Sequence, residues 1–519
     1  MSHLNVRPYN NHEILLFPPC IDDYLEDEHP VRMIDEVVET LNLTPLYEEI
    51  SNVGNPSYHP KMLVKLIFYA YANKTFSSRK IAEKTKTDVA FIYLSGMQKP
   101  DFRTISDFRK NNIEFLNTLF VEVVKICQRL GMIGIEHMSC DGSVFKANAS
   151  NDKSYTLKKI TQEEEEIQQQ IKELFSKAER TDHEEDEKYG LNNSGCELPD
   201  DINTKQKRAK KLQDILSKLQ SAKEKLRTLD ENKDTTKKKI NLTDNDAQIQ
   251  KDRGKKIPGY RGQIMVDAKE QVIVACDITS EQSDVNQAIP ITEQTLKNLQ
   301  IKKENSVDTN TKIKISADSG YSSGNNLKYF ENKHNIDAYI PDKEYQAQQR
   351  GKQGHRSQFN KEFFEYISEK NCFICPEGNK VTYIGQKLKR KKYIVSIYRC
   401  NDCINCKHFG ICTTCPQGRS IYVSGYEQSI SNMREKLSSC EGKKVYSRRQ
   451  VIVEPVFGNI KHNLGFREFL VRNKEKVRGE FALISIVHHI VKISGYLRKL
   501  GVSLNEALTI SPFIPVPSG

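Results

Sequence analysis

The chain has 519 residues, and its 79 Lys and Arg against 68 Asp and Glu give a formal net charge of +11. Charged residues make up 28% and hydrophobic residues 37%, which is too apolar for a disordered chain and too polar for a membrane protein. The N-terminal residues 1 to 13 are polar and do not form a signal peptide. We therefore expect a cytoplasmic, multi-domain protein whose excess of cations favours an acidic polymer as partner.

Residues 1 to about 130 are predicted to be helical, because apolar residues recur with helical spacing in VRMIDEVVETL and MLVKLIFYAYA. Short helices separated by polar turns are expected between His59 and Arg109, with Ser77 and either Thr87 or Asp88 as N-caps. This spacing permits a helix-turn-helix, and an ordinary helical bundle fits it equally well. Four cations crowd one of these helices, Arg79, Lys80, Lys84 and Lys86, and the first three are the candidate DNA-binding residues.

Two β-rich blocks flank a charged helical segment. The run IGIEHMSCDGSVFKA predicts a strand that ends close to Asp141. From about 156 to 240 the chain is rich in Glu, Lys, Gln and Leu, and the helical spacing of its apolar residues favours a hairpin of two long helices. The β pattern resumes with a predicted hairpin in YRGQIMVDA and QVIVACDITS, followed by a helix. Alternation in KIKISADSGYSS then places Asp318 at the end of a strand.

Three acidic residues are the candidates for chemistry. Asp141 and Asp318 are expected at the ends of two different strands, so both could face one cleft. Glu454 precedes Pro455, and because proline is best tolerated in the first turn of a helix, Glu454 is expected near a helix N-terminus. Three carboxylates suit Mg²⁺ or Mn²⁺, and two such ions can activate the attacking oxygen and stabilise the leaving oxygen of a phosphodiester. Two further carboxylates compete on spacing alone: Asp267 and Asp277.

Other residues around Glu454 could contact DNA. Lys461 follows Glu454 by seven residues, two helical turns, and is expected on the same helix face. A cation there would let a phosphate backbone approach a metal site. Tyr446 and Arg449 precede Glu454 and could contact flanking phosphates. For each of these side chains, a solvated position with no chemical role is the alternative.

Three blocks of the chain closely resemble the catalytic blocks of DDE transposases from bacterial insertion sequences: DGSVFKANAS, ADSGY and YSRRQVIVEPVFGNIKHNLGFREFLVRNKEKVRGE. The stretch from HPKMLVKLIFYAYA to RTISDFRK also resembles the helical leading domain of that family. The resemblance implies a ribonuclease-H-like core with a metal-binding triad: Asp141, Asp318 and Glu454. It also matches the signature after the second aspartate: Tyr446, Arg449, Glu454 and Lys461. Here four residues separate Arg449 from Glu454, whereas some branches of the family have three.

Seven of the thirteen cysteines lie in one segment: Cys372, Cys375, Cys400, Cys403, Cys406, Cys412 and Cys415. Without an export signal, a metal site is a better explanation than disulfides. Pairs of cysteines spaced like zinc knuckles suit a four-thiolate Zn²⁺ site of ribbon type. Seven thiols fall one short of two such sites, and His408 could complete the second. An iron-sulfur cluster on Cys400, Cys403, Cys406 and one of the last two cysteines is an alternative, as is a segment that has lost its metal.

These patterns predict an α/β protein with a ribonuclease-H-like mixed sheet flanked by helices. In chain order, the expected parts are a helical DNA-binding domain (1–130), the first part of the catalytic core (131–155), a helical hairpin insertion (156–240), the second part of the core (241–343), a cysteine-rich zinc-ribbon-like insertion (344–443) and the helical end of the core (444–519).

The expected activity is Mg²⁺- or Mn²⁺-dependent hydrolysis at the ends of an insertion sequence, followed by attack of the freed 3′-hydroxyl on target DNA. The expected partners are double-stranded DNA and a second copy of the chain, without a membrane. Two alternatives belong to other classes. One is a catalytically silent DNA-binding protein derived from a transposase, and the other is a zinc-ribbon interaction protein whose carboxylates are structural.

Overall fold

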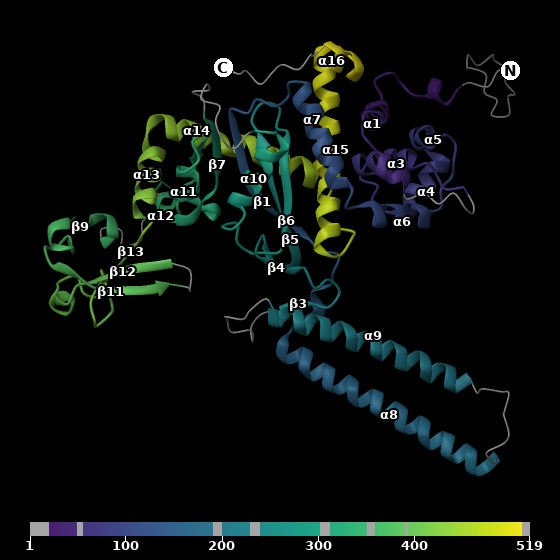
Figure 1. Ribbon diagram of the computed structural model, residues 1–519, viewed down its shortest axis with the longest axis horizontal. Coiled ribbons are helices and arrows are strands. Elements are labelled where there is room, and N and C mark those ends of the chain that lie inside the picture. Colours follow the sequence, from purple (N-terminus) through teal and green to yellow (C-terminus); the bar gives the residue numbers. More distant parts are fainter. Residues whose placement is uncertain are drawn as a thin grey trace, which may run out of the picture. The chain divides into compact units, whose positions relative to one another are not determined.

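The computed structural model describes residues 20–48, 56–189, 200–228, 239–301, 312–349, 359–389 and 393–510. The polar run 1–13, on which the expectation of no signal peptide depends, lies outside these ranges. The described residues form two compact units, one of residues 20–123 with 483–510 and one of residues 124–482 (Figure 1). Among the helices in the described ranges, none is both long enough and apolar enough to cross a lipid bilayer.

The first unit is helical, as its periodic apolar residues predicted. Its helices are α1 (Pro30–Glu39), α2 (Thr44–Glu48), α3 (Pro60–Ala72), α4 (Ser78–Thr87), α5 (Val89–Ser95), α6 (Phe102–Asn112), most of α15 (Lys474–Leu500) and α16 (Leu504–Ile510). Helix α3 is buried along most of its length and forms the centre. Asp88 caps α5 by accepting hydrogen bonds from the backbone N–H groups of Ala90 and Phe91. Asp88 alone separates α4 from α5, fewer residues than the turn of a helix-turn-helix contains.

A six-stranded mixed sheet forms the centre of the second unit, with β1 in its middle. The strands run in the order β4 (Gln248–Asp252), β5 (Lys255–Asp267), β1 (His137–Lys146), β7 (Ile313–Ala317) and β8 (Ile336–Tyr339), and β6 (Ile273–Thr279) pairs with β5. β1 is antiparallel to β5 and parallel to β7, and β7 is parallel to β8. This arrangement confirms the predicted mixed α/β sheet and the hairpin of β5 with β6.

Four of the described helices in the second unit pack on this sheet: α10 (Ala288–Asn298), α11 (Gly324–Glu331), α13 (Glu427–Ser438) and α14 (Cys440–Gly458). The unit also contains α12 (Lys343–Gln349) and the end of α7 (Leu116–Arg129), a helix that it shares with the first unit. The fully buried ring of Phe145 on β1 lies 5.4 Å from the ring of Phe481 and 5.8 Å from that of Phe469. Gly262 of β5 permits this packing, because a Cβ there would lie 2.6 Å from the Phe481 ring. The aromatic cluster thus anchors β1 to the C-terminal part of the chain.

The start of the helix that carries Glu454 was predicted wrongly. Helix α14 begins at Cys440, after the cap Ser439, so Pro455 lies in the interior of the helix. A proline there offers no N–H to the carbonyl four residues earlier. The side-chain amide of Gln271 donates to that carbonyl, on Val451, at 2.9 Å. A long-range contact therefore satisfies the backbone group that Pro455 leaves open, and Glu454 is far from the helix N-terminus.

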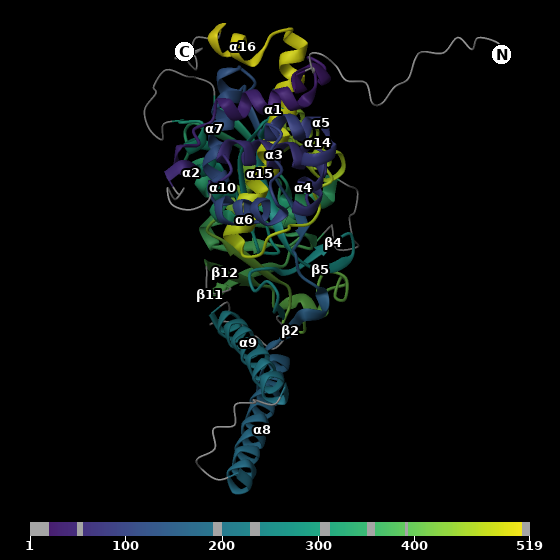
Figure 2. The same ribbon diagram turned by 90° about the vertical axis from the view of Figure 1, so that its right-hand side faces the viewer.

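The two long helices expected between residues 156 and 240 are present as α8 (Leu157–Tyr189) and α9 (Asp200–Thr228), which run side by side (Figures 1 and 2). At their base, β2 (Ser154–Thr156) pairs with β3 (Lys239–Asn241). A small apolar core holds the base together: Ile160, Leu219, Ala222, Leu226 and Ile240.

The cysteine-rich segment contains a five-stranded antiparallel sheet in the order β13 (Ser420–Ser424), β12 (Tyr393–Arg399), β11 (Lys380–Lys389), β10 (Cys372–Ile374) and β9 (Glu365–Ile367). Phe373, Val381 and Tyr398 form a buried cluster with Cys400 and Cys403. The cysteine-bearing loops thus pack against one side of this small sheet, which we call the cysteine module.

Candidate active site

Two aspartates occupy neighbouring positions at the edge where β1 and β7 stop pairing. The last parallel pair of these strands is Cys140 with Ala317, and the next residue on each strand is an aspartate, Asp141 and Asp318. Because adjacent strands lie about 4.8 Å apart, the two side chains start close together. Asp318 follows β7 directly, as predicted.

The prediction that β1 ends close to Asp141 was wrong. β1 continues to Lys146, because the thirteen-residue strand β5 goes on pairing with it beyond the point where β7 ends. Asp141 therefore lies within a strand that keeps a hydrogen-bonded neighbour on one side and has lost it on the other. On the side where β7 has ended, no strand pairs with Asp141, while pairing with β5 holds its backbone in place on the other side.

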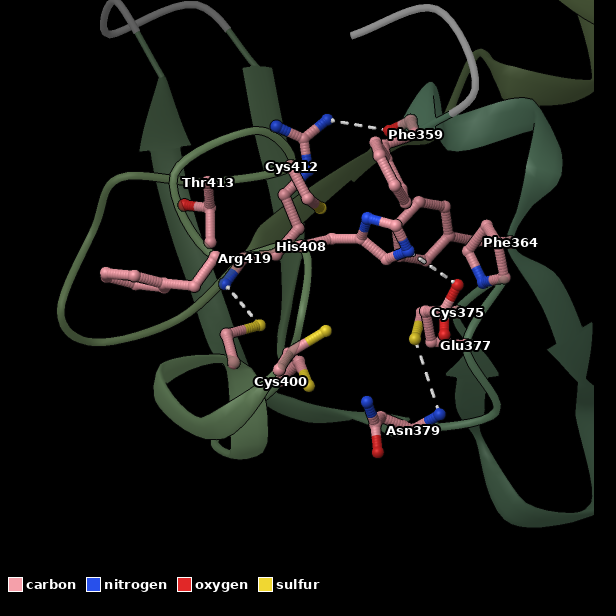
Figure 3. Close-up of a pocket in the computed structure, with 14 residues that line it drawn as sticks. Phe359, Phe364, Cys375, Glu377, Asn379, Cys400, His408, Cys412, Thr413 and Arg419 are labelled. Carbon is pink, nitrogen blue, oxygen red and sulfur yellow. Dashed lines mark hydrogen bonds and ion pairs between the residues drawn. The ribbon is translucent and has the colours of Figure 1, made fainter.

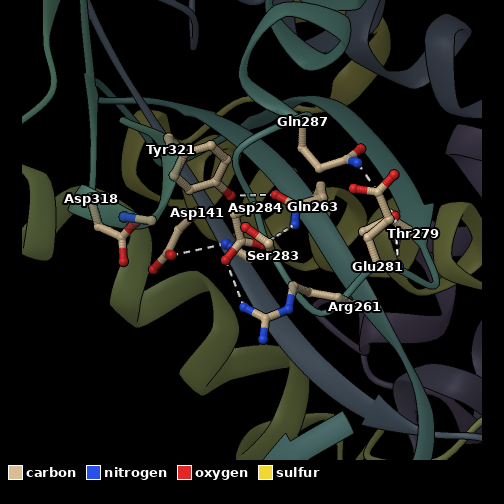
Figure 4. A network of polar contacts seen from close by, with 12 residues as sticks. Asp141, Arg261, Gln263, Thr279, Glu281, Ser283, Asp284, Gln287, Asp318 and Tyr321 are labelled. Carbon is tan, nitrogen blue, oxygen red and sulfur yellow. Dashed lines mark hydrogen bonds and ion pairs between the residues drawn. The ribbon is translucent and has the colours of Figure 1, made fainter. Parts of the chain in front are cut away.

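Each aspartate is oriented by the amide of a nearby glycine. The N–H of Gly142 donates to Asp141 Oδ1 at 2.8 Å, and the N–H of Gly320 donates to Asp318 Oδ1 at 2.7 Å. Figure 4 shows Asp141 and Asp318 beside each other, with the second oxygen of each carboxylate extending into the same space. The pair is thus held by its own backbone.

Burial makes the negative charge of Asp141 costly. It raises the pKa of Asp141 to about 6, against the opposing effects of the Arg449 guanidinium and the Gly142 amide, and the nearby charges of Asp318 and Asp284 add to the increase. A nearby cation stabilises the ionised form of such a carboxylate. Carboxylate oxygens in such a place are suitable ligands for a hard divalent ion.

Helix α14 carries two of the predicted residues to the aspartate pair. Arg449 is buried, and its Nη1 lies 3.5 Å from Asp141 Oδ2. That nitrogen has no hydrogen-bond partner among the described residues. Tyr446, one turn earlier, accepts a hydrogen bond from Gln346 at 3.3 Å, and Gln346 in turn accepts one from Ser319, the neighbour of Asp318, at 2.9 Å. Both side chains are therefore connected to the site.

Glu454 lies on the same helix but is exposed to solvent. It follows Arg449 by five residues, about 7.5 Å along the helix axis at about 1.5 Å per residue. Within the described ranges, no three Asp, Glu, His or Cys side chains are arranged to hold a metal ion. The structure therefore brings Asp141 and Asp318 together and does not join Glu454 to them.

Lys461 lies in a π-helical turn, η9 (Asn459–Asn463), that follows α14. Its Nζ donates to Ser143 Oγ at 2.7 Å and to the carbonyl of Val144 at 2.6 Å, and it lies 4.6 Å from the centre of the Phe145 ring. Burial lowers the pKa of Lys461 to about 8. In this structure Lys461 thus braces β1 just beyond Asp141.

The sequence analysis missed a third acidic side chain beside the pair, Asp284. Asp284 is buried and accepts hydrogen bonds from Arg261 Nη1 and Gln263 Nε2, both at 2.6 Å (Figure 4). It lies in the loop between β6 and α10, where no periodic pattern marks a residue as buried. The run EQSDVNQ carried no other signal that could have identified it.

The three candidate DNA-binding cations of α4 differ in their contacts with other side chains. Arg79 and Lys80 are exposed, and the Arg79 guanidinium stacks 4.1 Å from the centre of the Phe102 ring. The Nζ of Lys84 lies 3.0 Å from Asp88 Oδ2.

One small cavity gathers five of the seven clustered cysteines: Cys375, Cys400, Cys403, Cys406 and Cys412 (Figure 3). Its volume of about 20 Å³ suits a sphere the size of one water molecule. Backbone N–H groups donate to two of the sulfurs, from Asn379 to Cys375 at 3.3 Å and from Arg419 to Cys403 at 3.2 Å. Burial raises the pKa of Cys400 to about 12, and the neighbouring Cys403 and Cys375 add to the increase.

The other members of the cluster lie away from this cavity or have another partner. Cys372 is buried in β10, and Cys415 is exposed. His408 lines the cavity, but its Nε2 lies 2.9 Å from Glu377 Oε1. The cavity thus takes one thiol from each of the outer Cys-x-x-Cys pairs.

The raised pKa of Asp141 predicts that replacing it by Asn stabilises the metal-free protein above about pH 6. The unfolded carboxyl titrates near 3.8, so between about pH 4 and 6 the folded state holds the extra proton and stability falls as pH rises. Asp141→Asn avoids this cost, which amounts to about 3 kcal/mol at most.

Denaturant unfolding in EDTA at about pH 4 and pH 7.5 would measure the effect. The difference between variant and wild type should be small at the lower pH and favour the variant at the higher one. A variant that is less stable by the same amount at both values would contradict the assignment of a buried, charged Asp141.

An aspartate pair at the point where two parallel strands stop pairing, faced by an arginine, is the kind of carboxylate site that enzymes of metal-assisted phosphoryl transfer use. Residues 374–494 match the family model of the transposase DDE domain, and residues 19–111 match that of the transposase domain (DUF772). These two matches support a DDE-type transposase of an insertion sequence. No curated protein and no solved structure matches it.

Proposed function

We propose that this transposase binds the terminal inverted repeats of an insertion sequence and catalyses divalent-metal-dependent DNA strand cleavage and strand transfer. The observation that carries the proposal is the pair Asp141 and Asp318 on adjacent parallel strands, in a chain of the DDE transposase family. On one side of β1 lies an antiparallel hairpin, and on the other lie two parallel strands. This arrangement supports a ribonuclease-H-like core.

Asp141, Asp318 and Glu454 would hold Mg²⁺ or Mn²⁺. Asp141 and Asp318 offer only oxygen donors and are partly exposed, which fits such an ion. When bound, it would lower the pKa of the attacking water or 3′-hydroxyl and stabilise the leaving oxygen. The chain itself contributes the orientation of the carboxylates, through the amides of Gly142 and Gly320.

The cations around the pair have separate tasks in this proposal. Arg449 balances the charge of Asp141 in the free protein and turns to a DNA phosphate on binding; the support for this is that its Nη1, which pairs with Asp141, has no hydrogen-bond partner among the described residues. Lys461 keeps β1 in place beside the scissile phosphate. Arg79 and Lys80, with Lys84, contribute phosphate contacts in the helical domain. Two DNA ends must be paired for transposition, so the active form is a dimer or a larger assembly.

The test is a cleavage assay with the wild-type chain and duplexes carrying the flanking inverted repeats, with Mg²⁺ and with EDTA. Nicking at the repeat ends that requires the ion supports the proposal. Specific end binding without cleavage, with any divalent ion, would instead identify a silent DNA-binding protein. Failure to bind the ends at all would exclude both functions.

We also propose a structural Zn²⁺ in the cysteine module. The proposal is supported by five cysteines that line one cavity of about 20 Å³ and by two N–H···S hydrogen bonds, although no three of the described cysteines are arranged as metal ligands in this structure. Because a structural metal contributes folding energy, its removal should also lower the stability of the module.

Purified wild-type protein should contain about one zinc ion per chain by elemental mass spectrometry, and Cys400→Ser or Cys403→Ser should lose it. The control is Cys440→Ser, which changes an exposed cysteine outside the cluster. A folded wild-type protein without metal would contradict the proposal, and iron in place of zinc would favour the iron-sulfur alternative.

A further inference from the structure

Asp284 lies against the backbone of both metal-binding segments. A Cβ added to Gly142 would lie 2.8 Å from Asp284 Oδ1, and one added to Gly320 would lie 3.5 Å from Asp284 Oδ2. These two glycines supply the amides that orient Asp141 and Asp318. Asp284 therefore packs between the two short segments whose spacing sets the distance between the metal-binding carboxylates.

Asp284 is itself held by side chains from two other elements. Arg261 and Gln263 on β5 donate to Asp284 Oδ2 and Oδ1, respectively. Gln263 in turn accepts a hydrogen bond from the hydroxyl of Tyr321, which is fully buried and follows Gly320 directly. The network thus closes on itself: β5, the loop before α10 and the segment after Asp318 are tied together through one carboxylate (Figure 4).

Both oxygens of Asp284 are occupied by these donors, so in this structure Asp284 acts through its neighbours rather than as a metal ligand. Its charge nevertheless contributes to the site, because it adds to the increase in the pKa of Asp141, and the charge of Asp318 in turn helps to raise the pKa of Asp284. Arg261 compensates part of this charge, and the Arg261 Nε is buried without a hydrogen-bond partner among the described residues.

A purely structural ion pair is the competing explanation for Asp284 and Arg261. Buried pairs are often neutral for stability, because the desolvation of both charges offsets their attraction. A structural pair would affect folding without a particular effect on the metal site. The contact of Asp284 with both Gly142 and Gly320 favours a role at that site instead.

We propose that Asp284, fixed by Arg261 and Gln263, is a positioning residue that sets the geometry and charge of the Asp141–Asp318 pair for divalent ions. The inference rests on the proposed function, because it assumes that this pair binds the ions. Partners that orient metal ligands in this way commonly change metal affinity by about 10- to 100-fold when they are removed.

The test compares Asp284→Asn with wild type in the full-length chain. Asn keeps the shape of the side chain and removes its charge. Mn²⁺ binding without DNA, followed by electron paramagnetic resonance, should weaken by about 10-fold or more. The Mg²⁺ concentration for half-maximal cleavage should rise in parallel, while binding to the DNA ends stays unchanged.

The matched control is Asp244→Asn. Asp244 is also a buried aspartate that accepts hydrogen bonds, from Tyr260 at 2.8 Å, and its charged neighbour is Asp246 rather than the aspartate pair. This variant should lose stability but keep wild-type Mn²⁺ affinity. Arg261→Lys keeps the cation but loses the planar guanidinium, so it should give an intermediate loss of Mn²⁺ affinity. If Asp284→Asn does not fold, Arg261→Lys alone tests the role of Asp284.

Wild-type Mn²⁺ affinity and Mg²⁺ dependence in a folded Asp284→Asn, or in Arg261→Lys when the first variant does not fold, would overturn the inference. Asp318→Asn separates this outcome from a failure of the proposed function. If Asp318→Asn loses Mn²⁺ binding and cleavage while Asp284→Asn keeps both, only the role of Asp284 is wrong. If Asp318→Asn binds Mn²⁺ like the wild type, the metal site itself is misplaced.

Discussion

Asp318→Asn should reduce DNA cleavage by a factor on the order of 10³ or more, while binding to the repeat ends stays unchanged. A bound metal ion contributes several kcal/mol to transition-state stabilisation, and each 1.36 kcal/mol corresponds to about tenfold in rate. Asn retains the acceptor oxygen for the Gly320 amide, which holds Asp318 at 2.7 Å, so the local backbone is preserved. The loss therefore reports the missing charge. Labelled duplexes and single-turnover conditions would measure the rate.

The control for this prediction is Asp277→Asn on β6. Asp277 is another aspartate in the same sheet, and its Oδ1 pairs with Arg478 Nε at 2.6 Å rather than with the site. It should cleave at close to the wild-type rate. Equal activity of Asp318→Asn and wild type would show that Asp318 binds no metal ion and would remove the basis of the proposed mechanism.

Glu454→Gln should reduce cleavage by a factor on the order of 10² or more, because in the proposed triad Glu454 supplies one of the charges that would hold the ions. This is the sharper test of the triad, since the structure leaves Glu454 exposed on α14. End binding and the melting temperature should stay close to those of the wild type, because an exposed side chain contributes little to folding. Cleavage rate, end binding and melting temperature are measured on the same preparation.

The control is Glu441→Gln, which makes the same change of charge on the same helix. The Glu441 side chain is 72% exposed and its Oε1 lies 3.3 Å from Lys314 Nζ, so its loss should not affect cleavage. If Glu454→Gln cleaves like the wild type, the third carboxylate must come from another residue, and the resemblance in the last block does not extend to its role.

Local patterns predicted the aspartate pair only in part. The alternation of apolar and polar residues along β7 was sufficient to place Asp318, because successive side chains of a strand point to opposite faces of the sheet. The end of β1 was not predictable in the same way. Whether β1 stops at Asp141 depends on the length of β5, more than a hundred residues later in the chain. The residues of β1 alone do not show how far its pairing with this distant strand extends.

The positions of Glu454 and Asp284 show two further limits. The rule that proline favours the first turn of a helix failed at Pro455, because Gln271 compensates for the missing hydrogen bond. This compensation comes from a residue about 180 positions earlier. Asp284 was missed because it lies in a polar loop without apolar periodicity, and the partners that hold it, Arg261 and Gln263, belong to a strand earlier in the chain.

The short pairing of β2 with β3 has a consequence for how this chain can vary. The α8–α9 hairpin forms an arm, and β2 and β3 pair at its base. Ser154 pairs with Asn241 and Thr156 with Lys239, so the residue before α8 is held to the strand that follows α9. Since both ends are already clasped, the cost of a longer or shorter arm grows only slowly with the number of residues between them. The arm can therefore be extended, trimmed or exchanged between relatives while the register of β1 against β5, and with it the place of Asp141, is kept.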